Sequence, residues 1–254
     1  MDKRTIVIGD LHGCYDEALE LLKKCNATPD DRVIFLGDLV DRGPDNDRCV
    51  DLAMKHECIL GNHEEKHVSY ENELRRKGRL PSMPPTHTAA RMQLRSEHHE
   101  YFRSLPLMIK LPEFNAVCVH AGVYPGRPVS KQSPKHLLHI QSIDPYDKWG
   151  NLTGNEKSMW PSKAPEGWQF WTNFWKGPER IIFGHSVLDK PLLTDYVCGI
   201  DGGAVFGRDL HALVLPSWEI VTVSAKTDFG KGSRGRDNAD IAKFPVQDGV
   251  NTFS

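Results

Sequence analysis

The sequence has 254 residues and lacks three features that would each indicate a particular class of protein. No apolar run approaches the ~18 residues of a membrane-spanning helix. Neither charge is in strong excess, since the formal net charge is −2, whereas a domain that binds an extended phosphate backbone is usually strongly basic. No Cys-x-x-Cys pair is present. We therefore expect neither a membrane protein nor a protein whose main partner is extended nucleic acid.

The positions of the cysteines indicate the redox state of the cellular compartment in which the protein resides. Four of the six cysteines fall in or beside apolar stretches, where a thiol packs as a small hydrophobic side chain. The six are Cys14, Cys25, Cys49, Cys58, Cys118 and Cys198. This usage favours a reducing compartment, and the apolar run from Thr5 to Ile8 is too short for the core of a signal peptide. We expect a cytoplasmic protein.

Composition and length indicate one soluble globular domain. The chain is 39% hydrophobic and 26% charged, as ordinary folded proteins are. From Lys226 onward it is rich in Gly, Lys, Arg, Asp and Asn, with nothing that demands burial. We expect a folded domain over residues 1–225 and a flexible C-terminal tail over 226–254.

The pattern of apolar runs predicts an α/β fold. Buried strands are expected at 5–8, 32–36, 58–60, 116–119 and 180–183, with helices over 15–25 and 47–56. Strands that alternate with helices predict right-handed crossovers and a largely parallel sheet. Short β segments at 196–200, 210–215 and 220–224 predict a second sheet packed on the first.

Residues 65–105 read as a polar, mostly helical insertion interrupted by three prolines. We expect this insertion to lie beside the functional site as a cap. Its three histidines, His87, His98 and His99, are expected to be solvated rather than to bind a metal.

Polar residues follow the first two strands. Asp10 and His12 are two positions apart, a spacing that brings both side chains to the same side of a strand end, although a turn and a helix cap would explain them as well. Asp38 directly follows the second strand. A surface salt bridge explains Asp41 and Arg42 but leaves the Asp38 carboxylate without a compensating charge, which a metal ion would supply.

The same pattern recurs at three later strand ends. Asn62 and His63 follow the third strand, and His120 and His185 end two more. A single such histidine is more often a satisfied core residue. Five strand ends that each place Asp, Asn or His within two residues of a glycine favour a shared metal site instead.

These motifs, in this order, resemble the signature of the phosphoprotein phosphatase family of calcineurin-like metallophosphoesterases. The resemblance covers Ile6 to about Pro216 and implies a four-layer αββα sandwich with a helical insertion near 65–105. It also implies two metal ions that share Asp38. The first would be held by Asp10, His12 and Asp38, and the second by Asp38, Asn62, His120 and His185.

The resemblance further implies how such a site works. A hydroxide that bridges the two metals would attack phosphorus directly, without a covalent phosphoenzyme. Arg42 would neutralise the phosphoryl oxygens, and His63, oriented by Asp41, would protonate the leaving oxygen. Mn²⁺ is the expected divalent ion in vitro, with Fe or Zn as alternatives, because Asp, Asn and His suit all three.

Two departures from the eukaryotic pattern place the chain in a sub-branch. Leu60 precedes the Gly-Asn-His-Glu motif where eukaryotic members usually have Arg, and Ala121 follows His120 where they have Gly. These stretches are similar to the bacterial, phage-type and diadenosine-tetraphosphatase-like branches. Gln141 stands where related members often carry a phosphate-binding Arg, so we expect it to contact substrate as a weaker, neutral donor.

The resulting hypothesis is a metal-dependent phosphatase that acts on Ser/Thr phosphoproteins or small phosphomonoesters. The alternative is a hydrolase of dinucleoside polyphosphates, of the symmetrical diadenosine tetraphosphate type, or of other phosphoanhydrides. An inactive metal-binding interaction module is a third possibility, but it predicts a lost ligand, and all six ligand positions are retained. The sequence leaves the oligomeric state, native metal and physiological substrate open.

Overall fold

The computed structural model describes residues 4–159 and 163–230. The N-terminal strands belong to a five-stranded sheet. The strand order is β13-β12-β1-β2-β3. The bounds are β1 Thr5–Ile8, β2 Arg32–Phe35, β3 Glu57–Cys58, β12 Asp209–Leu215 and β13 Glu219–Ser224. β1, β2 and β3 run parallel, whereas β12 pairs antiparallel with β1.

Helices α1 (Tyr15–Lys24) and α2 (Asn46–Ala53) supply the crossovers between the parallel strands. Each helix turns an apolar stripe toward the sheet, and Ala18, Leu21 and Val50 are fully buried in the core between them. The helices expected over 15–25 and 47–56 are therefore confirmed.

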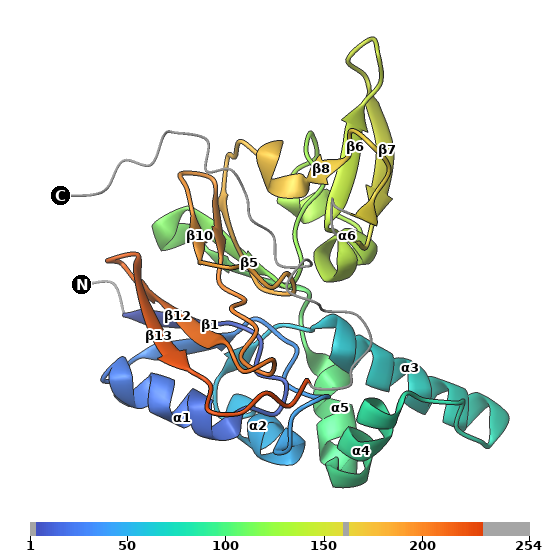
Figure 1. The fold of residues 1–254 in the computed structure, drawn as a ribbon, viewed down its shortest axis with the longest axis vertical. Helices are drawn as coiled ribbons and strands as arrows, with labels where there is room; N and C mark the ends of the chain where they lie inside the picture. The colour runs from blue at the N-terminus through green and yellow to red at the C-terminus, as the bar shows by residue number, and fades with distance from the viewer. Residues whose placement is uncertain (1–3, 160–162, 231–254) are drawn as a thin grey trace.

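A second five-stranded sheet packs against the first (Figure 1). Its order is β10-β11-β9-β5-β4, with β4 Met108–Leu111, β5 Ala116–Val119, β9 Arg180–Phe183, β10 Leu192–Leu193 and β11 Val197–Gly199. The short 3-10 helix η1 (Pro112–Phe114) links β4 to β5. Val7 and Ile34 of the first sheet meet Cys118 and Ile182 of the second in a core that both sheets share.

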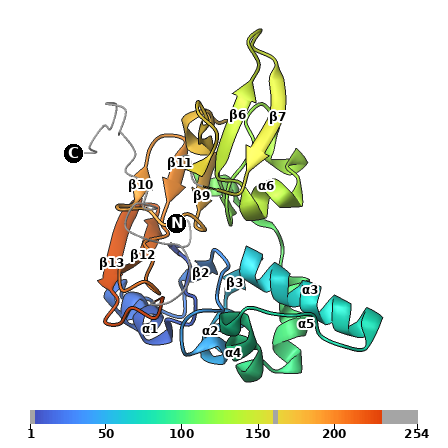
Figure 2. The same ribbon diagram turned by 45° about the vertical axis from the view of Figure 1, so that its right-hand side comes forward.

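The outer face of the second sheet is covered by mixed structure. A three-stranded sheet, β7-β6-β8, lies there with helix α6 (Figure 2). The bounds are β6 Ser142–Tyr146, β7 Leu152–Lys157, β8 Gln169–Phe170, α6 Pro134–His139, η2 Val129–Lys131 and η4 Trp171–Asn173. The α/β fold class is confirmed, with helices, two sheets and this mixed layer in succession.

The grouping of strands differs from the expectation. Segments 210–215 and 220–224 join the first sheet instead of forming a second one, and the runs at 116–119 and 180–183 build the second sheet. The physical reason is that β12 buries its apolar face most fully beside β1, where Leu213 pairs with Val7. Local apolar patterns identify strands but not their partners.

The helical insertion consists of α3 (Asn62–Lys77), α4 (Pro85–Gln93) and α5 (Ser96–Ser104). α3 packs against α5, and α4 and α5 pack against α2 (Figure 1). The expectation that its histidines are solvated is wrong. His98 is fully buried, His99 is 7% exposed and the His87 side chain is 13% exposed, because the three helices fold back on α2 and on one another.

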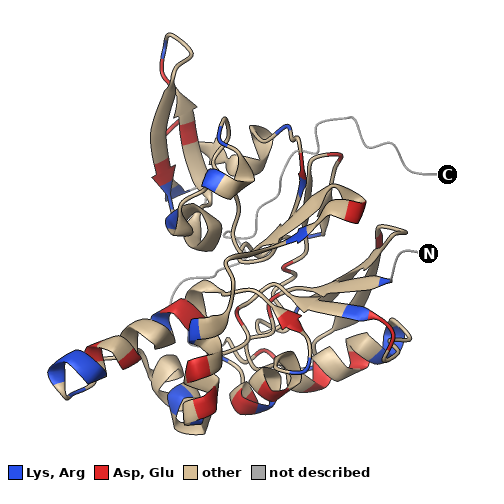
Figure 3. Ribbon diagram, turned by 180° about the vertical axis from the view of Figure 1, so that it is seen from behind, with Lys and Arg blue, Asp and Glu red and all other residues tan. Residues whose placement is uncertain are grey.

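Charges of both signs are interspersed over the helices in the view of Figure 3, and basic residues gather at the far end of α3. None of the helices within residues 4–159 and 163–230 combines the length and the apolar character that a membrane span requires. All six cysteines are buried as free thiols. Within the predicted tail, residues 226–230 are described, and the amides of Phe229 and Gly230 donate to Val205 O; the remainder lies outside the described residues.

Candidate active site

The loops that follow β1, β2, β3, β5 and β9 meet at one edge of the two sheets. There the main-chain amide of His185 donates to the Asp10 carboxylate at 3.0 and 3.1 Å, although 175 positions separate the two residues. The main-chain amide of His63 likewise donates to Asp38 Oδ1 at 3.0 Å. The structure thus brings together the side chains expected at five strand ends.

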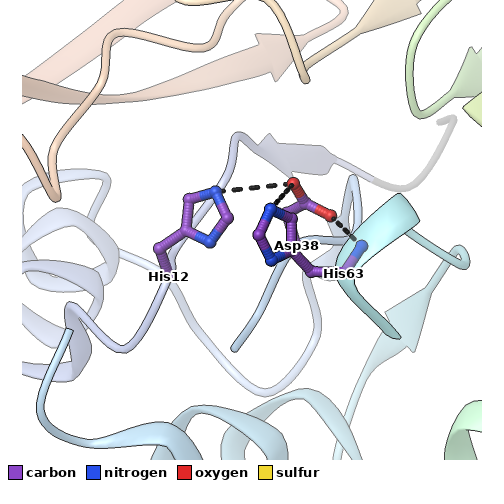
Figure 4. Close-up of side chains that lie close together, drawn as sticks. All are labelled: His12, Asp38 and His63. Carbon is purple, nitrogen blue, oxygen red and sulfur yellow. Dashed lines mark hydrogen bonds and ion pairs between the residues drawn. The ribbon is translucent and has the colours of Figure 1, made fainter. Parts of the chain in front are cut away.

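Asp38 lies at the centre of this group. His12 Nε2 is 3.4 Å from Asp38 Oδ2, and His120 Nε2 is 3.4 Å from Asp38 Oδ1. Asn62 Oδ1 lies 2.9 Å from His120 Nε2 and 2.8 Å from His185 Nδ1. Figure 4 shows the rings of His12 and His63 both turned toward the Asp38 carboxylate.

The orientation of two of these rings fits a cation. His12 Nδ1 is 2.7 Å from Val40 O, and His120 Nδ1 is 2.8 Å from Leu36 O, so in each ring the proton sits on Nδ1 and the lone pair on Nε2 faces Asp38. A lone pair opposite a carboxylate oxygen is repulsive, whereas a cation between the two is attracted by both. The donor set therefore suits metal ions.

Electrostatics leads to the same conclusion. Asp10, Asp38 and Asp201 are all buried. Burial and the neighbouring carboxylates of Asp201 and Asp38 raise the pKa of Asp10. Burial alone would also raise the pKa of Asp38, but the surrounding histidines, His120 foremost, lower it. A buried group of carboxylates is costly unless positive charge compensates it, and divalent ions would do so.

Strained backbone concentrates at this edge. Among the described residues, eight residues other than glycine have positive φ, and five of them belong to the predicted site: His12, Asp38, Asp41, Arg42 and His185. Such conformations cost free energy and cluster at functional sites, where the surrounding structure holds them.

Close packing explains two of the glycines in the motifs. A Cβ on Gly61 would come 2.2 Å from the main-chain nitrogen of Asp38, and one on Gly184 would come 2.1 Å from Asp10 Oδ1. Real side chains do not tolerate such distances, so glycine at these positions lets two site loops touch.

The predicted proton donor and its partner are also in contact. His63 Nδ1 is 2.5 Å from Asp41 Oδ2, and the Asp41 side chain is fully buried. Burial alone would raise the pKa of Asp41, but its hydrogen bonds to His63 and His67 lower it, so this carboxyl is ionised.

The two residues expected to contact substrate lie in different surroundings. Arg42 Nη1 contacts His12 Nε2, and its guanidinium lies 5.6 Å from the centre of the Phe206 ring. Gln141 is buried, and its side-chain amide donates to Ser186 Oγ at 3.3 Å. Arg42 lines the cavity at the metal-ligand group, whereas Gln141 is not among the residues that line it.

Three residues at the site were not anticipated as functional. Asp201 lines the same cavity as Asp10, the Glu64 carboxylate accepts a hydrogen bond from the main-chain amide of Asp38, and His67 is hydrogen-bonded to Asp41. A signal existed for Glu64, since an acidic residue at the third position of a helix is typical of a capping box. Asp201 and His67 reach the site only through tertiary packing.

Two connected hollows lie over the site. A cavity of about 60 Å³ is lined by five of the six predicted ligands, all but His120, and by Arg42, Asp201 and Phe206, and it has room for only a few water molecules. Beside it lies an open groove of about 720 Å³, which shares Asn62 and His63 with the small cavity. Its remaining walls are Glu65, Lys66, Ser69, Tyr70, Glu73, Pro81, Ser82, Pro84, His87 and His139.

The fold and this group of predicted ligands are typical of a metallophosphoesterase, and comparison with known proteins shows the family. The model of the calcineurin-like phosphoesterase family matches residues 3–211. The chain belongs to this family, and it is a hydrolase of the metallophosphoesterase type. Members use divalent metal ions.

Similar proteins span nearly the whole chain. The asymmetrical bis(5'-nucleosyl)-tetraphosphatase PrpE of Oceanobacillus iheyensis is 27% identical, covering 88% of this chain and 93% of that protein. The protein of the same name from Halalkalibacterium halodurans is 28% identical, covering 87% and 93%. A solved structure provisionally described as a diadenosine tetraphosphatase has a TM-score of 0.75 at 27% identity, covering 88% and 94%.

Proposed function

We propose that this chain is a two-metal phosphohydrolase that cleaves a phosphoanhydride bond in dinucleoside polyphosphates. Asp10, His12 and Asp38 would hold one ion. Asp38, Asn62, His120 and His185 would hold the other, and Mn²⁺ is the ion expected to support activity in vitro. The bound ions would supply Lewis-acid activation of the attacking water and of the phosphoryl oxygens.

The residues around the ligands would bind substrate and transfer the proton. Because His63 Nδ1 bonds to Asp41, the ring presents Nε2 to the leaving oxygen, and a proton held there can pass to that oxygen. Arg42 has to leave His12 Nε2 when that nitrogen binds an ion, and its long side chain can then meet a phosphoryl oxygen.

The observation that carries the choice of substrate is the groove beside His63. A leaving group that takes its proton from His63 would extend into this groove, which at about 720 Å³ is of the size of nucleotide and drug pockets. A nucleobase would lie against Tyr70, Pro81 and Pro84, and the Lys66 ammonium would meet a phosphate. The names of the similar tetraphosphatases agree with this chemistry.

A substrate panel on protein of measured metal content tests the proposal. Diadenosine tetraphosphate, p-nitrophenyl phosphate and a phosphoserine peptide would be compared with Mn²⁺, Asp38→Asn protein serving as the inactive control. We expect kcat/KM for the dinucleotide to exceed that for the aryl phosphate by about tenfold or more, equivalent to about 1.4 kcal/mol. Chromatography of the products distinguishes AMP plus ATP from two ADP. Turnover of the peptide and not of the dinucleotide would overturn this choice of substrate.

A further inference from the structure

The Asp41 carboxylate is surrounded by three imidazoles, of which the predicted mechanism uses one. His63 Nδ1 lies 2.5 Å from Oδ2, His67 Nε2 lies 2.8 Å from Oδ1, and His87 Nε2 lies 3.3 Å from Oδ2. His63 and His67 are one turn apart on α3 and so share a face of the helix. His87 comes from α4, the second helix of the insertion.

The hydrogen-bonding pattern assigns the role of each ring. The Tyr70 hydroxyl is 3.2 Å from His87 Nδ1 and donates to it, which leaves the His87 proton on Nε2, where it faces the carboxylate. His67 Nε2 must also carry its proton to donate to Asp41. His67 Nδ1 is buried and, among the described residues, has no hydrogen-bond partner, which agrees with a lone pair at that atom.

We propose that His67 and His87 are positioning residues for His63, because they hold the Asp41 carboxylate in the one orientation that keeps Oδ2 against His63 Nδ1. The inference rests on the proposed function, in which His63 donates the proton. A carboxylate held by a single partner turns about its terminal bond, whereas donors on both oxygens prevent that rotation.

Packing makes the arrangement rigid. The His67 and His87 rings stack with centres 5.6 Å apart and 19° between their planes, and the His63 ring lies 5.3 Å from that of His87. His67 and the Asp41 side chain are fully buried. The insertion thus acts on the catalytic centre directly, and His87 is at once a wall of the substrate groove and a support for the proton donor.

The test compares leaving groups. His87→Leu removes the donor, His87→Gln keeps an N–H at the place of Nε2, and His98→Leu is the matched control. His98 is a buried insertion histidine that also binds a carboxylate, that of Asp51 at 3.1 Å. Turnover of phenyl phosphate depends more on proton donation than turnover of p-nitrophenyl phosphate, whose leaving group is stable as an anion.

We expect His87→Leu to lower kcat for phenyl phosphate by about tenfold more than kcat for p-nitrophenyl phosphate, a fraction of what a general acid contributes. His87→Gln should recover most of that loss, and the metal content of both variants should stay at the wild-type value. His98→Leu should affect both substrates equally. Equal losses on both substrates in His87→Leu, or a fall in its metal-to-protein ratio, would overturn the inference.

A second measurement does not depend on turnover. The short hydrogen bond between His63 and Asp41 should give a downfield proton NMR signal, assigned by its disappearance in His63→Asn. This signal should move in His67→Leu and in His87→Leu but not in His98→Leu; an unmoved signal refutes the positioning role. If wild-type protein with measured metal cleaves none of the phosphate substrates, the proposed function fails first, and this inference fails with it.

Discussion

Replacement of Glu64 by glutamine should damage both the stability of the fold and the metal site. Glu64 is fully buried, and its carboxylate accepts hydrogen bonds from the main chain of two site loops. Oε2 accepts from the amides of Asp38 at 2.8 Å and Gly61 at 3.1 Å. Oε1 accepts from Leu39 at 2.9 Å and Val40 at 3.3 Å. One side chain therefore fixes the loop that carries Asp38, the predicted shared ligand.

The magnitude follows from the geometry. In Glu64→Gln one carboxylate oxygen becomes an NH₂ group, and whichever way the amide turns, two buried main-chain N–H groups face a donor instead of an acceptor. Each such group costs about 1–3 kcal/mol, so we expect a loss of about 2–6 kcal/mol in the free energy of unfolding. For a domain of this size that corresponds to a fall in Tm of roughly 4–24 °C.

Thermal and urea unfolding of wild type, Glu64→Gln and Glu65→Gln, each with and without Mn²⁺, would measure the effect. Glu65→Gln is the matched control, since it makes the same chemical change at the next residue. The Glu65 carboxylate is 44% exposed and pairs only with His139 among the described residues, at 2.8 Å, and such exposed pairs contribute about 0–1 kcal/mol. Indistinguishable stabilities of the two variants would refute the argument that Glu64 organises the loop.

Three further outcomes follow. Asp38→Asn should abolish turnover and metal binding, because Asp38 faces predicted ligands of both ions. His63→Asn should lower kcat and leave the metal-to-protein ratio unchanged. Elemental analysis together with kinetics distinguishes these two outcomes. Phe102→Ala removes a fully buried aromatic side chain of α5 and should lower the free energy of unfolding, measured by urea titration, by about 3–5 kcal/mol. A loss below about 1 kcal/mol would contradict the place of Phe102 in the core. Burial lowers the pKa of His99 from 6.5 to about 4, so the unfolded chain binds more protons in that range and stability should fall as pH drops from 6.5 to 4. Melts of His99→Gln against pH should show a shallower slope.

The sequence predicted the fold class, and the polar side chains that it grouped at five strand ends lie close together in the structure. β1, β2 and β9 lie where short apolar runs end in glycine, because buried strands need apolar residues on both faces and close loop contacts need residues without side chains. These constraints act on neighbouring residues, so they produce a pattern that can be read in the sequence. The same pattern grouped Asp10, Asp38 and Asn62 as residues that follow buried strands.

Local patterns were less informative about burial in the insertion. His87, His98 and His99 lie in polar helical segments, which predicted exposure, but the helices fold back on α2 and bury all three. A polar residue in a polar segment carries no sign of a buried partner elsewhere in the chain.

The sequence by itself determined where the strands that lead into the site lie, which polar residues follow them and which family chemistry they resemble, because each of these depends on neighbours along the chain. Only the tertiary structure decided how the strands divide between two sheets, that Asp201 lines the same cavity as Asp10, and that His67 and His87 lie against Asp41. Such contacts join segments that are distant in sequence. A side chain whose partner lies in a distant segment produces no periodic pattern in the sequence around it. The predicted metal ligands were therefore visible in the sequence, whereas the residues that support them were found only in the fold.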